Sequence, residues 1–158
     1  MTQSNESLEL PRKQALALAL RLLARREHSR FELAQKLRQR QFSEAVIDHA
    51  LSVCEQEDWL SDARYAEAFI RQRLEAGYGE LRIRSELHQH GVATTEAIRL
   101  MFEMADGYAS ALDVRCKRFG DEPAATEGER VRQWRYLQQR GFTGEQIRYA
   151  IAAEREDA

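Results

Sequence analysis

The chain has 158 residues, of which 43% are hydrophobic and 32% are charged, and its formal net charge is −2. The apolar residues are spread along the chain, which excludes a wholly disordered protein, and no apolar run approaches the roughly 20 residues that span a bilayer. The two cysteines, Cys54 and Cys116, have no paired spacing, which favours buried apolar residues over a disulfide scaffold. The run ALALALRLLA from Ala15 is bracketed by basic residues, and it predicts a core helix of a cytoplasmic protein rather than a signal peptide.

Helical signals dominate the chain, and nine helices are predicted with almost no strand signal. The first begins near Pro11, which suits an opening helical turn, and ends near Glu27. Ser29 begins the second helix, and Glu32 three residues later completes a capping-box pattern. The third helix begins at Ser43, whose hydroxyl can accept from amides of the first turn.

The next three helices follow the same plan. Ser61 caps the fourth, which ends at Gly77. The fifth follows Gly79, and the sixth runs from about Thr94 to Ala105. These spacings predict a second unit of three helices.

The last three helices are separated by the longest loop of the chain. The seventh runs from near Gly107 to Phe119, and a loop over residues 121–125 precedes the eighth. Capping boxes begin the eighth helix at Thr126 and the ninth at Thr143.

One segment recurs three times at a spacing of nearly fifty residues, as LRQRQFSEAVI from Leu37, LHQHGVATTEAI from Leu87 and LQQRGFTGEQI from Leu137. Glycine ends the helix in the later copies, at Gly91 and Gly141, because it can adopt the left-handed conformation. The first copy carries Gln41, which we expect to strain this turn by up to about 1 kcal/mol. The repeat predicts an all-α fold of three tandem three-helix repeats forming an elongated curved array, which presents a surface rather than a catalytic pocket.

The predicted boundaries place the repeats at residues 10–60, 61–106 and 107–154, with a flexible N-terminus over 1–9 and a tail over 155–158. Charge alternates within these repeats. Residues 11–40 hold nine basic residues against two acids, whereas residues 41–70 hold seven acids against one arginine. Basic residues one turn apart repel by roughly 0.2–0.5 kcal/mol, which favours an anionic partner, either nucleic acid or an acidic protein surface. The alternative is that basic helices lie beside acidic helices of the same array.

The residues expected to form a partner-binding basic surface come from all three repeats. They are Arg25, Arg26, Arg30, Lys36, Arg82, Arg84, Arg115, Lys117, Arg118, Arg132 and Arg135. Their expected role is to steer association and fix register by charge, not to read bases.

Catalytic and metal-binding patterns are lacking in the sequence. His88 and His90 are two residues apart, so on a helix they point in different directions and cannot share a metal. No phosphate-binding glycine loop or nucleophile elbow occurs, which predicts a protein that is not an enzyme and uses no cofactor or metal. The aromatic residues lie at helix-packing intervals, which favours core positions over base stacking.

The succession of motifs resembles the RecX family of recombination regulators over nearly the whole chain. The segments that show this resemblance are ALRLLARREHSRFELAQKL from Ala19, WLSDARYAEAFIRQRLEAGYGELRIRSEL from Trp59 and YLQQRGFTGEQI from Tyr136. The resemblance implies a curved helical monomer that binds the RecA recombinase filament on single-stranded DNA and restrains its ATPase, strand-exchange and coprotease activities. The sequence departs from the family's pattern at Gln41 and at Gln133, which stands where Leu33 and Ile83 supply an apolar contact.

Two other functions remain compatible with the sequence. A helical DNA-binding protein, either sequence-independent or of the helix-turn-helix type, could use the basic face on single-stranded or duplex DNA. A generic helical adaptor without any DNA connection is the second. Steep salt dependence of DNA affinity would distinguish the first from the second.

Overall fold

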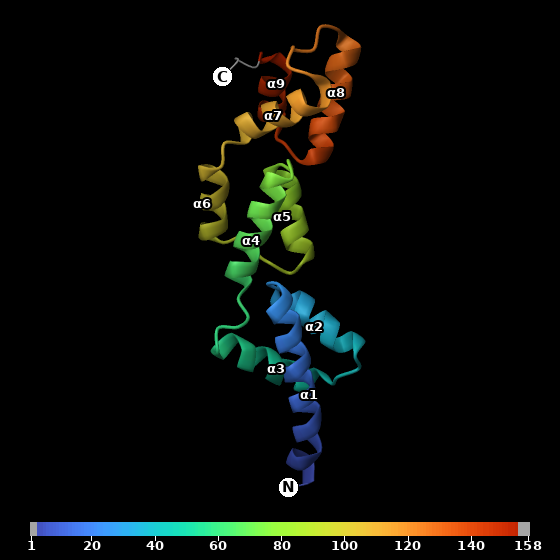
Figure 1. Cartoon of the computed structure of the whole chain (residues 1–158), viewed down its shortest axis with the longest axis vertical. Coiled ribbons are helices and arrows are strands. Elements are labelled where there is room, and N and C mark those ends of the chain that lie inside the picture. The colour runs from blue at the N-terminus through green and yellow to red at the C-terminus, as the bar shows by residue number, and fades with distance from the viewer. Residues whose placement is uncertain (1–2, 155–158) are drawn as a thin grey trace. The chain divides into compact units, whose positions relative to one another are not determined.

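The computed structural model describes residues 3–154, and over that range every regular element is a helix (Figure 1). The nine helices of this range are α1 (Gln3–Arg25), α2 (Arg30–Gln39), α3 (Glu44–Gln56), α4 (Asp62–Glu75), α5 (Glu80–Gln89), α6 (Glu96–Met104), α7 (Gly107–Phe119), α8 (Glu127–Arg140) and α9 (Gly144–Ala152). The prediction of an all-α protein with nine helices is therefore confirmed for the described residues.

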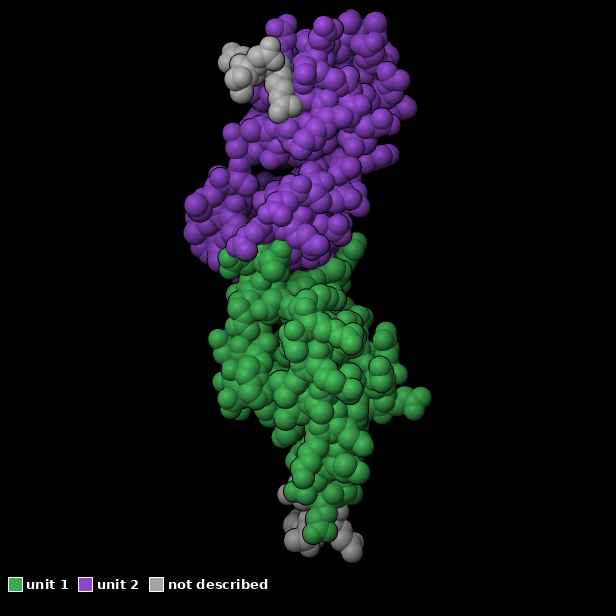
Figure 2. All heavy atoms as spheres, in the orientation of Figure 1, with its two compact units in different colours: residues 1–68, 89–92 green, residues 69–88, 93–158 purple. Residues whose placement is uncertain are grey.

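The helices form two compact units, one of residues 1–68 with 89–92 and one of residues 69–88 with 93–158 (Figure 2). In the first unit, α1 packs along α3 and α2 packs on both. Its buried core includes Ala15, Ala19, Leu33, Leu37, Ile47 and Leu51. In the second unit, α7 and α8 pack on α9 around a core that includes Ala111, Leu137, Phe142, Ile147 and Ala150.

Helix α1 begins earlier than the sequence predicted. It begins at Gln3, so Pro11 lies inside the helix instead of in its first turn. Leu8 lies beyond Pro11 on the N-terminal side and packs against the core of the first unit. Burial of Leu8 offsets the backbone hydrogen bond that proline cannot donate.

The predicted helix caps are confirmed with one shift. Capping boxes form at Ser29, Thr126 and Thr143. The cap of helix α6 is Thr95, one residue after the predicted Thr94, and its hydroxyl accepts from the Ile98 amide at 3.3 Å. Side-chain oxygens at these positions satisfy amides that have no partner within the helix.

The same joint occurs once in each compact unit. In the first, the Ser29 hydroxyl donates to the carbonyl of His90 at 2.8 Å. In the second, the Gly79 amide donates to the carbonyl of Arg140 at 2.7 Å. The two residues of the second pair lie fifty positions after those of the first pair. Each joint therefore connects the segment before the second helix of one repeat to the end of the second helix of the next repeat.

Close backbone approach explains the glycines at these joints. A Cβ on Gly91 would lie 2.5 Å from the Phe31 Cβ, and one on Gly141 would lie 2.3 Å from the Arg82 Cβ. Both glycines also have positive φ, 73° and 95° respectively. Gln41 has φ 64° and an exposed side chain, so it shares the backbone conformation without the crowding.

Replacing Gln41 by glycine is expected to stabilise the protein. The change removes the steric penalty of the left-handed conformation, although glycine also raises the entropy of the unfolded chain. We expect Q41G to raise the free energy of unfolding by about 0.5–1 kcal/mol in urea titrations followed by circular dichroism. The matched control is Q39G, which places glycine in the last turn of α2 and should be destabilising by up to about 1 kcal/mol. An equal loss of stability in both variants would contradict the strain at Gln41.

Candidate partner-binding surface

Three of the predicted basic residues lie together on α7 and α8 of the second unit. Arg118, Arg132 and Arg135 line one open groove of about 400 Å³. Its other lining side chains are apolar or uncharged, namely Phe119, Val131, Tyr136 and Gln139. We call this feature the Arg132 groove. No acidic residue of the described chain lines it, so the charged side chains that line this groove are all basic.

The arginines of the Arg132 groove are not neutralised by carboxylates. All three are exposed, and no ion pair is found for them among the described residues. The Arg118 guanidinium lies 5.6 Å from the Phe119 ring centroid and 5.7 Å from that of Tyr136. The two rings themselves pack edge to face at 5.4 Å. Ring contacts position a guanidinium but leave its charge available to a partner.

Arg115 was predicted to lie on this surface, and that placement is wrong. Its side chain is fully buried, with 0% exposure. The guanidinium donates to the carbonyl oxygens of Ala150 at 2.9 Å, Gly120 at 2.8 Å and Glu122 at 2.6 Å, and also to that of Ala153. A charge among carbonyl oxygens is satisfied by hydrogen bonds, so Arg115 holds the end of α9 and the loop after α7 in place.

Lys117 is exposed but is already paired. Its ammonium lies 2.7 Å from an Asp113 carboxylate oxygen one turn earlier on α7. It lines a different groove from Arg132, one that also contains Glu75 and Asp113. Lys117 therefore faces a surface of mixed charge, and Arg118 lines both this groove and the Arg132 groove.

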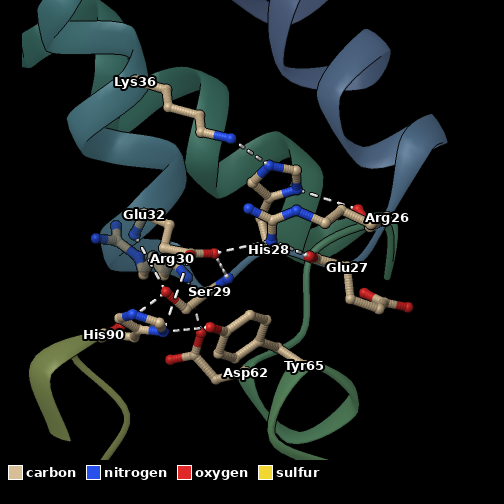
Figure 3. Close-up of polar contacts among 10 residues, drawn as sticks. All are labelled: Arg26, Glu27, His28, Ser29, Arg30, Glu32, Lys36, Asp62, Tyr65 and His90. Atoms are coloured by element: carbon tan, nitrogen blue, oxygen red, sulfur yellow. Dashed lines mark hydrogen bonds and ion pairs between the residues drawn. The ribbon is translucent and has the colours of Figure 1, made fainter. Parts of the chain in front are cut away.

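Three of the predicted basic residues of the first repeat, Arg26, Arg30 and Lys36, lie around the joint at Ser29 (Figure 3). Arg26 pairs with Glu32 at 3.2 Å. Arg30 pairs with Glu55 at 2.5 Å, and its amide donates to Asp62. These bases therefore serve the packing of the first unit. Arg25 is exposed, and no ion pair is found for it in the described residues.

His28 is the buried centre of that network, with 1% exposure. Its Nδ1 lies 3.1 Å from the Arg26 carbonyl, and its Nε2 lies 2.8 Å from the Lys36 ammonium (Figure 3). A neutral ring fits both contacts, donating to the carbonyl and accepting from the lysine. Burial lowers the pKa of His28 below 6.5, and the nearby charges of Arg26 and Lys36 act in the same direction.

Arg82 and Arg84 are also engaged within the second unit. Arg82 lies 4.4 Å from the Tyr78 ring centroid and donates to the carbonyl of Gln139 at 3.2 Å. Arg84 pairs with Glu80 at 2.6 Å and lies over Phe102. Both are part of packing between helices, so little of their charge faces a partner.

Tyr78 and Arg140 are residues that the sequence analysis missed. Three guanidiniums lie 4.4–5.1 Å from the Tyr78 ring centroid, those of Arg73, Arg82 and Arg140. Arg140 also donates to the carbonyl of Ala76 at 3.0 Å. The available signal was the repeat itself, since Arg140 occupies the position of His90, whose ring lies 2.5 Å from the Tyr65 hydroxyl.

Other kinds of site are not found in the part of the chain that the structure describes. No group of three or more histidine, cysteine or acidic residues there could hold a metal ion. No helix within residues 3–154 combines the length and apolarity needed to span a membrane.

Comparison with known proteins identifies the repeats. Models of the first, second and third three-helix domains of RecX match residues 15–53, 61–97 and 105–151. The chain is 45% identical to the regulatory protein RecX of Halorhodospira halophila over 140 residues, 88% of this chain and 87% of the relative. It is 38% identical to that of Vibrio parahaemolyticus over 158 residues, 99% and 100% of the two chains.

A solved structure shares the fold. The crystal structure of RecX from Lactobacillus salivarius is 18% identical and superposes with a TM-score of 0.74, covering 89% of this chain and 94% of its own. The three domain matches and this neighbour confirm three tandem three-helix repeats.

Removal of the Arg115 guanidinium is expected to lower the stability of the second unit. R115M keeps much of the side-chain volume but leaves four carbonyl oxygens without their donor. We expect a loss of about 3–5 kcal/mol in the free energy of unfolding, measured by urea titration. R118M on the same helix is the control and should lose less than about 1 kcal/mol. Similar losses in the two variants would contradict a structural role for Arg115.

Stability is expected to fall as the pH drops below 6.5, because the unfolded chain then protonates His28 while the native chain does not. The contribution of His28 to the free energy of unfolding is fully present above pH 6.5. On acidification this free energy decreases by up to about 1.4 kcal/mol per pH unit. The measurement is urea unfolding between pH 7.5 and 5. H28N should flatten the pH dependence, whereas H88N, a change at an exposed histidine of α5, should keep it. Equal slopes in the two variants would disprove the assignment to His28.

Proposed function

The chain belongs to the RecX family of regulatory proteins, and we propose that it binds the RecA recombinase filament on single-stranded DNA and inhibits the filament's ATPase, strand-exchange and coprotease activities. The protein acts by binding, as a monomer, and its own residues carry out no chemistry. The observation that supports this role is the Arg132 groove, whose charged lining side chains are all basic, in a chain whose net charge is −2.

The Arg132 groove is the part of the predicted basic surface best suited to an anionic partner. Guanidinium groups bind carboxylates and phosphates with two parallel hydrogen bonds, which fixes orientation as well as attraction. Arg118 is already held over two rings, so less side-chain entropy is lost when it binds. Arg132 and Arg135 reach the same groove from α8. Together they provide complementarity to acidic filament surface or to DNA phosphates.

The other members of the predicted set contribute less to this proposal. Arg25 is exposed on α1 and remains part of the proposed surface. Arg26, Arg30, Lys36, Arg82, Arg84 and Lys117 each have an ion pair or hydrogen bond within the protein, as described above. Exchanging such a pair for a partner contact yields little net free energy, because the internal pair must first be broken.

Charge reversal in the Arg132 groove is expected to weaken inhibition of RecA. We expect R118E/R132E/R135E to raise the concentration needed for half-inhibition of the filament ATPase by about tenfold or more, since attraction becomes repulsion. The measurement is the steady-state ATPase rate of RecA on single-stranded DNA as the protein is titrated. Helicity by circular dichroism should be unchanged, because all three residues are exposed.

A matched control carries the same change in net charge elsewhere. K13E/R21E/R40E reverses three exposed bases, on α1 and at the end of α2, that lie outside the groove and for which no ion pair is found among the described residues. This variant should inhibit RecA nearly as well as the unaltered chain. Full inhibition by the groove variant, or equal losses in both variants, would reject the Arg132 groove as the partner site.

The helical DNA-binding alternative is tested with the same variants and no RecA. Affinity for a single-stranded oligonucleotide is measured by fluorescence anisotropy at several salt concentrations. Tight binding that falls steeply with salt, together with no effect on the RecA ATPase, would replace the regulator with a DNA-binding protein.

A further inference from the structure

A second groove lies between α8 and α9 on the third repeat, and the proposed function does not use it. It is open to solvent and has a volume of about 580 Å³. Its floor is apolar and consists of Val131, Trp134, Ile151 and Ala152. We call it the Trp134 groove. A volume in this range is enough to enclose one large apolar side chain with its backbone.

The rim of the Trp134 groove carries positive charge that the protein leaves unpaired. Arg135 and Arg148 line it, both exposed, and no ion pair is found for either among the described residues. The lining also contains one acid, Glu127, which pairs with the third arginine of the lining, Arg130, at 3.1 Å. Two guanidiniums therefore remain available beside an apolar floor.

We propose that the Trp134 groove is a docking site for a short acidic peptide segment of a partner protein. One bulky apolar side chain of the segment lies on the floor, against the Trp134 indole. Carboxylates that flank this side chain pair with Arg135 and Arg148. Burial of the apolar side chain supplies the affinity, and the two arginines set the direction of the segment.

The lining argues against a nucleic acid as the occupant. A base buried on this floor would place its polar edges against aliphatic side chains, and a donor or acceptor left without a partner there disfavours binding. The lining offers a single uncharged polar side chain, that of Gln138. Trp134 offers one flat aromatic face, but Val131 and Ile151 offer none, so the floor cannot stack successive bases. A branched or aromatic side chain of a peptide carries no such polar edges.

The two grooves of the third repeat are related but separable. Arg135 lines both. Of these two grooves, Arg148 lines the Trp134 groove alone, and Arg118 and Arg132 line the Arg132 groove alone. The docking proposal does not depend on RecA binding. A peptide assay without RecA therefore tests it independently of the proposed function.

The chain permits a probe that reports from inside the groove. It has two tryptophans, so W59F leaves Trp134 as the sole indole. Trp59 is 43% exposed, and its replacement by phenylalanine spares the core. The full-length W59F protein is titrated with a synthetic twelve-residue peptide that has one phenylalanine flanked by aspartates and glutamates. Trp134 fluorescence and peptide anisotropy are recorded together.

Binding is expected with a dissociation constant of roughly 10–100 µM and a shift of the Trp134 emission. Changing phenylalanine to serine in the peptide, or its acids to amides, should each weaken binding about tenfold or more. R148E in the W59F background should weaken it by a similar factor while leaving the core intact. R118E/R132E in that background is the matched control and should bind the peptide within about twofold of W59F.

Several outcomes would overturn the proposal. The first is that no peptide binds at 1 mM. The second is that the peptide anisotropy changes while the Trp134 emission does not. A third is displacement of the peptide by an uncharged peptide of equal length. An oligothymidylate that shifts Trp134 emission more strongly than the peptide would assign the groove to nucleic acid instead. Concentration-dependent self-association abolished by R148E would assign it to a second copy of this chain.

Discussion

The structure depends on a hydrogen-bonded joint between the beginning of the second helix of one repeat and the end of the second helix of the next repeat. The first amides of a helix and its last carbonyls lack partners within the helix. In the second unit, the Gly79 and Leu81 amides at the start of α5 donate to the carbonyls of Arg140 and Gly141 at the end of α8. Each helix end thus satisfies the other. This requires close backbone contact, and a Cβ on Gly79 would lie 2.5 Å from the backbone of Gly141.

The joint determines which arginines remain available for a partner. In the second unit it places Arg82 and Arg140 around Tyr78, where they donate to backbone carbonyls. In the first unit the corresponding contact comes from Ser29 and His90, and neighbouring bases pair with acids around it. A basic residue near a joint is therefore committed to packing. Three arginines of α7 and α8 that lie away from the joints, Arg118, Arg132 and Arg135, have no ion pair among the described residues.

Sequence reasoning recovered the fold well because helix ends carry local signals. Ser29, Thr126 and Thr143 act within three residues of themselves, so their capping boxes could be read directly. The start of α1 was missed because packing of Leu8 on a distant core overrides the local preference of proline. The basic surface was predicted less well for the same reason. Whether Arg115 is buried, or Arg118 lies over Phe119, depends on helices that charge spacing does not place.

A chain with a net charge of −2 can still present a strongly positive surface, because pairing matters more than the total. An ion pair such as that of Lys117 with Asp113 cancels most of the field beyond it. A guanidinium held over an aromatic ring keeps its full charge and a restricted position, as Arg118 does. In the third repeat such ring contacts border a groove that no acidic side chain of the described residues lines. We therefore propose that attraction for an anionic partner is concentrated on this repeat, although acidic residues outnumber basic ones in the chain as a whole.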